Sequence, residues 1–427
     1  MGTILKNGKL LNEQGELESK DLLIIDGKIT TIDVTIKNDA GHEEIELAGK
    51  LVAPGLIDVH VHFREPGFEA KETIETGAKA AVAGGYTTVS CMPNTRPVID
   101  TPETVTFVVD KAKEAGLARV LPYASITVRE LGRELTDFAA LKEAGAFALT
   151  DDGVGVQGAG MMKEAMKRAK ELDISIVAHC EENDLLPPGA ALHDGVKAAK
   201  HGLPGIPSES ESIHVGRDIL LAEATGVHYH VCHISAKESV RLVRDGKRAG
   251  VNVSAEVTPH HLLLCDEDIP DSLDANWKMN PPLRSKADRE ALIEGLKSGS
   301  IDIIATDHAP HTEEEKAKEL ARAPFGIVGL ETAFPLLYTH LVEKGVLTLS
   351  ELVDKMATKP AELFNLPYGK LAVGEIADLA VFDLETERAI DPEQFESKGK
   401  NTPFAGWTCK GWNVLTMVEG KIVYQRA

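Results

Sequence analysis

The stretch Leu56-Ile57-Asp58-Val59-His60-Val61-His62 decides the fold of this chain. Its apolar residues predict a buried strand, and the spacing of two places both histidines on one side of it. Seven further short apolar runs follow, at 86–92, 119–126, 146–150, 174–179, 228–234, 251–256 and 301–306. Amphipathic helical patterns lie between most of them, for example at 72–85 and 160–172. Eight strands with helical crossovers over about 250 residues predict a (β/α)8 barrel.

An open, doubly wound sheet is the alternative fold for the same alternation. That fold typically carries GxGxxG after its first strand, and no such motif follows residue 62. The two chain ends contain short β-like runs broken by Gly and Asp. We expect residues 1–52 and 366–427 to form one small β-sandwich, and residues 53–365 to form the barrel. Two separate β-appendages are the alternative.

The composition excludes several classes of protein. The chain has 427 residues, with 46 Lys and Arg against 67 Asp and Glu, so its net charge of -21 disfavours nucleic acid and anionic lipid as partners. We find no apolar run of about 18 residues that would span a membrane, and no signal-peptide pattern at the start. The five cysteines form no CxxC, which predicts free thiols. These features predict a cytoplasmic protein.

Metal-binding residue types stand at the ends of five predicted strands. In (β/α)8 barrels the chemistry lies at the C-terminal ends of the strands. An HxH pair alone is a weak signal, and an Asp pair alone is more often a turn or a helix cap. Here both occur together with histidine and aspartate at three further strand ends, which predicts a metal centre. The residues are His60 and His62, Asp151 and Asp152, His179, His233, and Asp307.

These motifs resemble the amidohydrolase superfamily and, within it, the dihydroorotase family. The resemblance rests on PGLIDVHVHFREPG (54–67), CMPNTRP (91–97), TDDGVGVQ (150–157), MNPPLR (279–284), ATDHAPH (305–311), APFGIVGLETAFPLL (323–337) and NTPFAGW (401–407). It covers essentially the whole chain and is closest to the long bacterial class. The resemblance implies a set of metal ligands, a substrate pocket and an activity.

The resemblance implies two zinc ions per subunit, one bound tightly and the other weakly. It implies His60, His62 and Asp307 as ligands of the first ion, His179 and His233 as ligands of the second, and Asp152 between both. Relatives such as hydantoinases use a carboxylated lysine at the bridging position. The run TDDG offers no lysine, which favours the dihydroorotase class. Zinc suits imidazole and carboxylate ligands, although manganese or cobalt could substitute.

The resemblance also implies a substrate pocket. Its expected residues are His62, Phe63, Arg64, Asn94, Asn280, His311, Phe325 and Gly326. Arg64 would bind the substrate carboxylate as a bidentate donor, helped by Asn94 and His311. Asn280 and the backbone at 325–326 would hold the amide edges of the ring. The alternatives are a surface ion pair for Arg64 and a turn role for Asn94.

The implied activity is the reversible hydrolysis of dihydroorotate to N-carbamoyl-L-aspartate. Asp307 would take a proton from the attacking water and deliver it to the leaving ring nitrogen. A sister cyclic amidase such as allantoinase or dihydropyrimidinase is the nearest alternative, but those substrates lack the carboxylate. A scaffold homologue is the other alternative, although such proteins typically lose metal ligands. A homodimer and an association with aspartate transcarbamoylase are the implied assemblies.

Other histidines and cysteines beside these motifs are not assigned to metal. We expect the two histidines after the seventh strand to be structural, the one after Asp307 to point away, and the cysteines to pack in the core. These residues are His228, His230, His260, His261, His308, Cys180 and Cys232.

Overall fold

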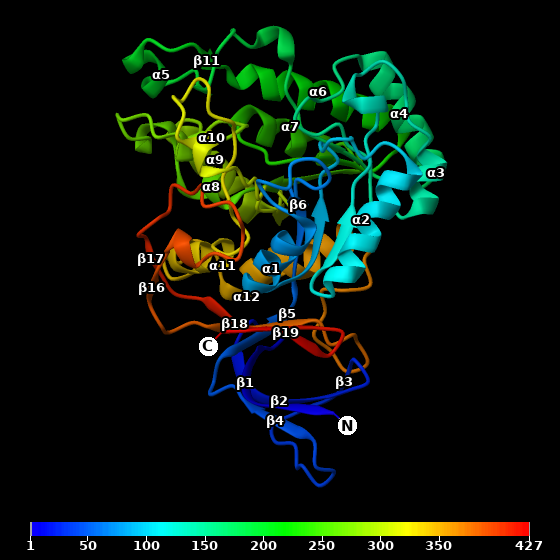
Figure 1. Ribbon diagram of the computed structural model, residues 1–427, viewed down its shortest axis with the longest axis vertical. Coiled ribbons are helices and arrows are strands. Elements are labelled where there is room, and N and C mark those ends of the chain that lie inside the picture. Colours follow the sequence, from blue (N-terminus) through cyan, green and yellow to red (C-terminus); the bar gives the residue numbers. More distant parts are fainter. Residues whose placement is uncertain (1, 427) are drawn as a thin grey trace.

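The computed structural model describes residues 2–426 and places a barrel above a smaller β-rich layer (Figure 1). Two sets of parallel strands form the barrel wall, in the orders β6-β7-β8 and β9-β12-β13-β14. The strands are β6 (Leu56–Val61), β7 (Tyr86–Cys91), β8 (Arg119–Pro122), β9 (Ile176–Ala178), β12 (Tyr229–Val231), β13 (Val253–Val257) and β14 (Ile303–Ile304). All lie in predicted strand ranges except that β13 continues one residue beyond 256.

Isolated bridges close the barrel between these two sets. Leu149 pairs with both Ala124 and Ile176, and Val61 pairs with His308. The expected strand at 146–150 is therefore present only as this single bridging position. The run lies between Gly145, which has a left-handed φ of 110°, and the turn at Asp151, so few residues remain for a ladder. The closed ring confirms the predicted barrel and rules out an open sheet.

Helices surround the barrel and are capped by their own sequence. α2 (Pro102–Ala115) shows the pattern clearly: the Thr101 side chain caps its first turn, Pro102 begins it, and left-handed Gly116 ends it. The other crossover helices are α1 (Ile74–Ala83), α3 (Phe138–Ala144), α4 (Ala159–Glu171), α6 (Ser208–Thr225), α7 (Lys237–Arg248) and α9 (Lys286–Ser298). Shorter elements are α5 (Val196–His201), α8 (Pro259–Leu263), α10 (Glu313–Lys316), α11 (Ala333–Leu337), α12 (Leu349–Val353), α13 (Lys359–Leu363), β10 (Leu192–His193) and β11 (Gly205–Ile206).

The two chain ends join in one sheet of eight strands. Its order is β19-β18-β15-β5-β1-β2-β3, with β4 on β1. These strands are β1 (Thr3–Leu11), β2 (Leu17–Ile25), β3 (Lys28–Asp33), β4 (Glu43–Glu46), β5 (Leu51–Pro54), β15 (Leu379–Asp383), β18 (Trp412–Val418) and β19 (Lys421–Gln425). Val52 of β5 pairs with Val381 of β15, so two separate appendages are excluded. Leu5, Leu22 and Leu415 share one apolar core, which places both ends around a common interior.

The sheet is fastened to the barrel beneath α1. Asn413 and Thr416 of β18 donate hydrogen bonds to the carbonyl of Val82, at 3.0 Å and 2.6 Å. Figure 1 shows β18 and β19 lying between the barrel and β1 to β4. These hydrogen bonds hold the C-terminal end of α1, the first crossover helix, against the sheet.

β16 (Arg388–Ala389) and β17 (Thr408–Cys409) pair with each other outside this sheet, and the segment between them climbs the side of the barrel (Figure 1). Within it, Asn401 accepts from the backbone N–H of His311 at 2.9 Å. Part of the range 366–427 therefore reaches the barrel mouth. Within residues 2–426, no helix has both the length and the apolar character needed to cross a bilayer.

Candidate metal and substrate site

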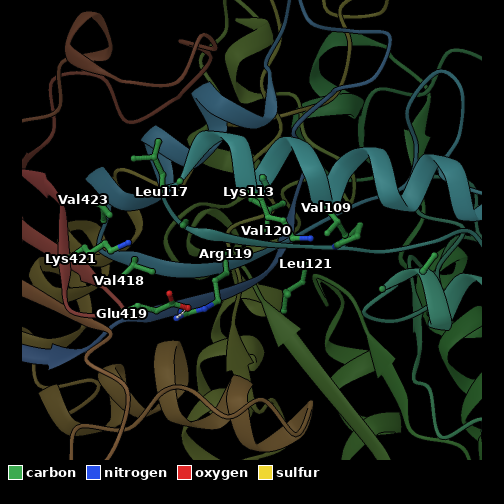
Figure 2. Close-up of a pocket in the computed structure, with 16 residues that line it drawn as sticks. Val109, Lys113, Leu117, Arg119, Val120, Leu121, Val418, Glu419, Lys421 and Val423 are labelled. Carbon is green, nitrogen blue, oxygen red and sulfur yellow. Dashed lines mark hydrogen bonds and ion pairs between the residues drawn. The ribbon is translucent and has the colours of Figure 1, made fainter. Parts of the chain in front are cut away.

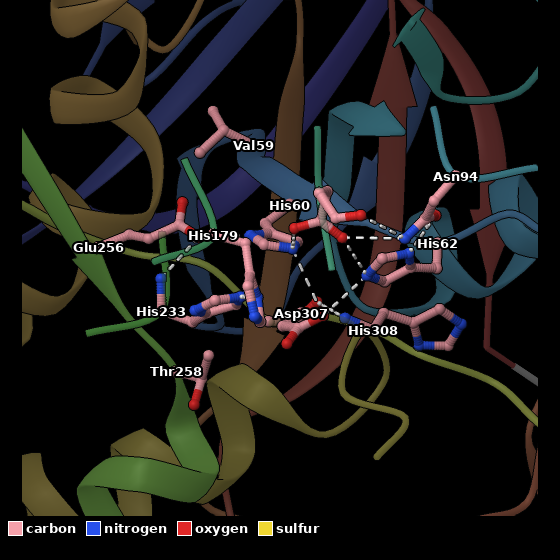
Figure 3. A network of polar contacts seen from close by, with 12 residues as sticks. Val59, His60, His62, Asn94, His179, His233, Glu256, Thr258, Asp307 and His308 are labelled. Carbon is pink, nitrogen blue, oxygen red and sulfur yellow. Dashed lines mark hydrogen bonds and ion pairs between the residues drawn. The ribbon is translucent and has the colours of Figure 1, made fainter. Parts of the chain in front are cut away.

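The first three predicted ligands converge at the C-terminal end of the barrel (Figure 3). Asp307 Oδ1 lies 3.1 Å from His62 Nε2 and 3.5 Å from His60 Nε2. His60 and His62 lie on β6 and directly after it, and Asp307 follows β14, which is next to β6 in the closed ring. Strand pairing therefore brings together residues about 245 positions apart in sequence.

The remaining three predicted ligands lie beside the first group. His179 Nδ1 and His233 Nε2 are 3.1 Å apart, and the ring of His233 lies 4.9 Å from that of His60. Asp152 faces both histidines of β6, with 3.6 Å from its carboxylate to each Nε2. Asp152 also clusters with His60 and His233, so it lies beside members of both groups, and its bridging role stays a prediction.

The two aspartates of the TDDG turn have different partners. Asp151 accepts from the backbone N–H of Thr127 at 2.9 Å and also from the Thr127 hydroxyl. Asp152 instead points at His60 and His62. Asp151 is therefore used to hold the loop after β8, and Asp152 alone faces the centre.

Unpartnered atoms show that these residues fit a metal. Four buried atoms have no hydrogen-bond partner: His60 Nε2, Asp152 Oδ1, His179 Nε2 and His233 Nδ1. Leaving such a group unpaired costs about 1–3 kcal/mol each. Nitrogen and carboxylate oxygen are the ligands that zinc takes in catalytic sites. His60 Nε2 and Asp152 Oδ1 face each other at 3.6 Å, and a bound cation would give both atoms the partner that the protein does not.

Burial tunes the acid–base state of the centre. Burial, together with His179 and His60, lowers the pKa of His233 well below its usual value, which keeps a lone pair free on the ring. Burial raises the pKa of Asp307 to about 6, although His60 opposes the shift. A carboxylate with a pKa near neutrality is suited to exchanging a proton during catalysis.

Three site residues adopt left-handed backbone conformations. The φ angles are 62° at Arg64, 27° at His233 and 47° at Asp307. Such conformations are uncommon outside glycine and concentrate at functional sites, where surrounding structure enforces them. Each of these residues lies two or three positions after a barrel strand, where the sharp turn re-aims its side chain.

Sequence reasoning missed Glu256, which orients the His60 ring through a hydrogen bond. His60 Nδ1–H donates to Glu256 Oε1 at 2.6 Å, leaving Nε2 of His60 free for the centre. His62 is fixed in the same way, because its Nδ1–H donates to Asn94 Oδ1 at 3.1 Å. The only signal in the sequence was a carboxylate at the end of the apolar run 251–256.

The predicted carboxylate-binding residues fall into two places. Arg64 lies beside His311, with Nη2 of Arg64 3.3 Å from Nε2 of the ring, and its Nε–H donates to Pro310 O. Asn94 instead donates to Asp152 Oδ2 at 3.0 Å while it holds His62. Asn94 therefore contacts two of the proposed ligands, whereas Arg64 and His311 lie together at another side of the pocket.

The other predicted substrate residues are held by protein partners. Asn280 donates to Glu181 at 3.4 Å. The ring of Phe63 is buried against Gly77 of α1, so a substrate contact would come from its backbone. His311 Nε2–H donates to the carbonyl of Phe325 at 2.7 Å. Gly326 donates its N–H to Lys278 O. The backbone groups at 325–326 that were expected to hold the amide edges of the substrate ring therefore already have protein partners.

The comparisons with known proteins agree with this geometry. Residues 49–239 match the family model described as "Dihydro-orotase-like". The chain is 72% identical to a dihydroorotase of Brevibacillus brevis, with 100% of both chains covered. It is 62% identical to a dihydroorotase of Bacillus subtilis, with 100% of this chain and 99% of that one covered.

The chain belongs to the dihydroorotase family.

Solved structures place this dihydroorotase family member among cyclic amidases. An L-hydantoinase (dihydropyrimidinase) from Arthrobacter aurescens superposes with a TM-score of 0.89 at 28% identity, covering 100% of this chain and 96% of that one. A D-hydantoinase from Thermus sp. gives 0.82 at 27% identity, covering 99% and 95%. The predicted fold and the predicted cyclic-amide hydrolase class are thereby confirmed.

The histidines and cysteines that the sequence analysis did not assign to metal lie elsewhere in this member of the dihydroorotase family. His308 turns away from the centre, as expected, because its Nε2 lies 3.4 Å from Glu72 and its Nδ1 accepts from Gly329 N–H. His261 is held by Thr258 and the carbonyl of Pro281. His260 is buried in α8. Cys180 and Cys232 are buried, as predicted.

Two of the cavities outside the cluster of six ligands lie beside Asn94 and beside α2. One of about 740 Å³ begins at Asn94 and extends past Phe68, Arg96 and Glu130, so it adjoins the substrate side of the centre. The other, of about 470 Å³, lies between α2, β8 and the β18–β19 turn and is mostly apolar (Figure 2). None of the six ligands lines either cavity.

A second residue that sequence reasoning missed is Asn401, from the segment that climbs the barrel. It accepts from His311 N–H and donates to the carbonyls of Ala309 and Gly326, at 3.0 Å and 2.9 Å. Gly326 cannot be larger, because a Cβ there would meet Ala309 O at 2.5 Å. Asn401 therefore ties together both sides of the pocket predicted to bind the substrate.

Replacing Asn401 with alanine should raise the KM for dihydroorotate about tenfold while kcat changes less. The variant loses three hydrogen bonds that hold the pocket wall, each worth about 1 kcal/mol, but leaves the six ligands in place. Steady-state kinetics and metal content on the same preparation measure this. Asn276→Ala, an Asn in the short turn after Asp274, is the matched control. An unchanged KM in Asn401→Ala would show that the segment does not position the pocket.

Proposed function

We propose that this chain catalyses the reversible hydrolysis of (S)-dihydroorotate to N-carbamoyl-L-aspartate, the third step of de novo pyrimidine synthesis, with two zinc ions. The observation that carries the proposal is the convergence of six buried ligands beside Arg64 and His311. The six ligands supply metal donors, and Arg64 and His311 supply a carboxylate site. A scaffold homologue would not need all six ligands in this arrangement.

Each zinc ion would have its own set of donors. His60, His62 and Asp307 would hold one ion, and His179 and His233 would hold the other. Asp152 would contact both, because its carboxylate faces His60 and His62 of the first set and also clusters with His233 of the second. When bound, the ions would supply Lewis-acid activation of water and of the ring carbonyl. Unequal affinity of the two ions belongs to this proposal.

Asp307 would move the proton in both directions. Its carboxylate would accept a proton from the attacking water and give it to the ring nitrogen as the amide bond breaks. With no metal bound, burial raises the pKa of Asp307 to about 6, a range in which a carboxylate exchanges protons readily. In the synthetic direction the same carboxylate would take the proton from the nitrogen.

Arg64 would select dihydroorotate over other cyclic amides. A guanidinium can donate two parallel hydrogen bonds to a carboxylate, and the substrates of allantoinase and dihydropyrimidinase have no carboxylate at this place. Burial lowers the pKa of Arg64 to about 10, so the side chain stays charged at neutral pH. Burial and Arg64 lower the pKa of His311, so the neighbouring ring stays neutral, and its single N–H would reach the carboxylate only by leaving the Phe325 carbonyl.

Arg64→Lys should therefore reduce kcat/KM for dihydroorotate by about 10- to 100-fold, mainly through KM. The lysine keeps the charge but loses the planar fork, which is worth about 1.5–3 kcal/mol in hydrogen bonds to charged groups. Arg133→Lys, on the exposed surface, is the matched control. Kinetics with dihydroorotate and with hydantoin measure the change. Wild-type efficiency in Arg64→Lys, or a preference of the wild-type protein for hydantoin, would favour the sister-amidase alternative.

We further propose that the protein works in the cytoplasm as a homodimer and associates with aspartate transcarbamoylase. The net charge of -21 and the free thiols are compatible with that compartment. Sedimentation of the purified protein, alone and with the transcarbamoylase, tests both assemblies.

A further inference from the structure

A continuous chain of hydrogen-bonding side chains crosses the barrel interior beneath the metal ligands. It begins at Ser175, whose Oγ lies 2.8 Å from His228 Nδ1. His228 Nε2 lies 2.8 Å from Ser254 Oγ, and that oxygen lies 2.7 Å from His230 Nδ1. His230 Nε2 then lies 3.0 Å from Glu256 Oε2. The chain comes from three neighbouring strand segments and uses His228 and His230, neither of which has a ligand role.

Glu256 connects this chain to ligands from both groups. Its Oε1 accepts from His60 Nδ1–H at 2.6 Å and from the backbone N–H of His233 at 3.2 Å. Figure 3 shows Glu256 beside His60 and His233. One carboxylate thus orients a ring assigned to the first ion and the backbone of a residue assigned to the second.

The chemistry of the atoms fixes two of the protons. A carboxylate only accepts hydrogen bonds, so both rings that contact Glu256 must donate to it. His60 donates through Nδ1, which leaves its lone pair on Nε2, the unpartnered atom that faces Asp152 and Asp307. His230 donates through Nε2, and Ser254 holds its other nitrogen. Turning the His230 ring would break a contact at each of its two ends, and turning the His60 ring would break its contact with Glu256.

His230 has no other way to act on the centre than through Glu256. It is fully buried on β12, and its two ring nitrogens are used by Ser254 and Glu256. The ring packs 5.3 Å from that of Phe364. Removing its N–H would leave Glu256 Oε2 buried without this donor, and the carboxylate would be free to rotate off His60.

We propose that His230 is a positioning residue for metal binding. By donating to Oε2 it holds Glu256 in the orientation in which Oε1 receives His60 Nδ1–H, and so keeps His60 Nε2 available to the metal. Outer hydrogen-bond partners of this kind typically change metal affinity by about 10- to 100-fold. The inference rests on the metal centre of the proposed function.

The test compares zinc affinities of purified, metal-free variants by competition with a chromophoric chelator. His230→Leu removes the N–H and should weaken zinc binding about 10- to 100-fold. His230→Gln places an amide N–H where Nε2–H stood and should stay within about threefold of wild type. Ser254→Ala frees the other side of the His230 ring and should weaken binding at least about threefold. His340→Leu, a histidine beside Trp407, controls for loss of a histidine.

The spectrum of the cobalt-loaded protein gives a second readout, because its visible bands report the ligand geometry. They should shift in His230→Leu and match wild type in His230→Gln. Equal weakening in both variants would overturn the proposal, since the ring rather than its hydrogen bond would then matter. Wild-type affinity in His230→Leu would overturn it directly. If that variant does not fold, wild-type affinity in Ser254→Ala overturns it instead. A wild-type protein that binds no zinc would refute the proposed centre itself.

Discussion

Replacing Asp307 with asparagine should lower turnover about 100- to 10,000-fold in both directions of the reaction, the range typical for loss of a general acid–base group. Asparagine keeps the size and one oxygen of the side chain, but its amide does not accept the proton. Asp307 stands 3.1 Å from His62 Nε2, so the variant retains an oxygen near the first group of ligands. Arg64 and His311 are unchanged, and substrate affinity should fall far less than turnover.

Metal content, ligand binding and turnover should be measured on one preparation of Asp307→Asn. Asp151→Asn is a matched control, because Asp151 holds Thr127 instead of facing the centre. Turnover of Asp307→Asn within a few-fold of wild type, with its metals retained, would mean that another group moves the proton. His308 is a poor substitute, since it is turned toward Glu72.

Removing metal with a chelator should abolish dihydroorotate hydrolysis, and zinc should restore it. The metal-free protein should also unfold at a lower temperature, because a ligand that binds only the folded state stabilises that state. The unpartnered buried atoms His60 Nε2 and Asp152 Oδ1, which face each other, give the structural reason, since the protein supplies no hydrogen-bond partner for them. Thermal unfolding with and without zinc is a readout that does not depend on activity. Identical unfolding temperatures would argue against a metal in this place.

The barrel and the ligand cluster could be predicted because both depend on strand ends. Each ligand lies at or just after an apolar run, and parallel strands bring those ends together whatever the sequence separation. The length of the strands was less predictable. The run at 146–150 forms only a bridge at Leu149, and β14 has two residues, because caps and turns next to the runs take up the remaining positions.

The hydrogen-bond partners of the ligands could not be predicted from one sequence. Glu256 and His60 are 196 residues apart, and nothing local to either indicates the contact. Asn401 lies in a range predicted to belong to the sandwich, yet its segment crosses to the barrel mouth. Phe63 was expected in the pocket, but its ring is needed in the core against Gly77. Such pairings depend on the complete chain path.

The most direct test of the central claim is a zinc titration of metal-free protein with dihydroorotate ring opening as the signal. We predict no hydrolysis before zinc is added and a rise to full activity by two equivalents per chain, with little activity toward hydantoin or allantoin. Metal-free protein that hydrolyses dihydroorotate as fast as the zinc-loaded protein would contradict this account.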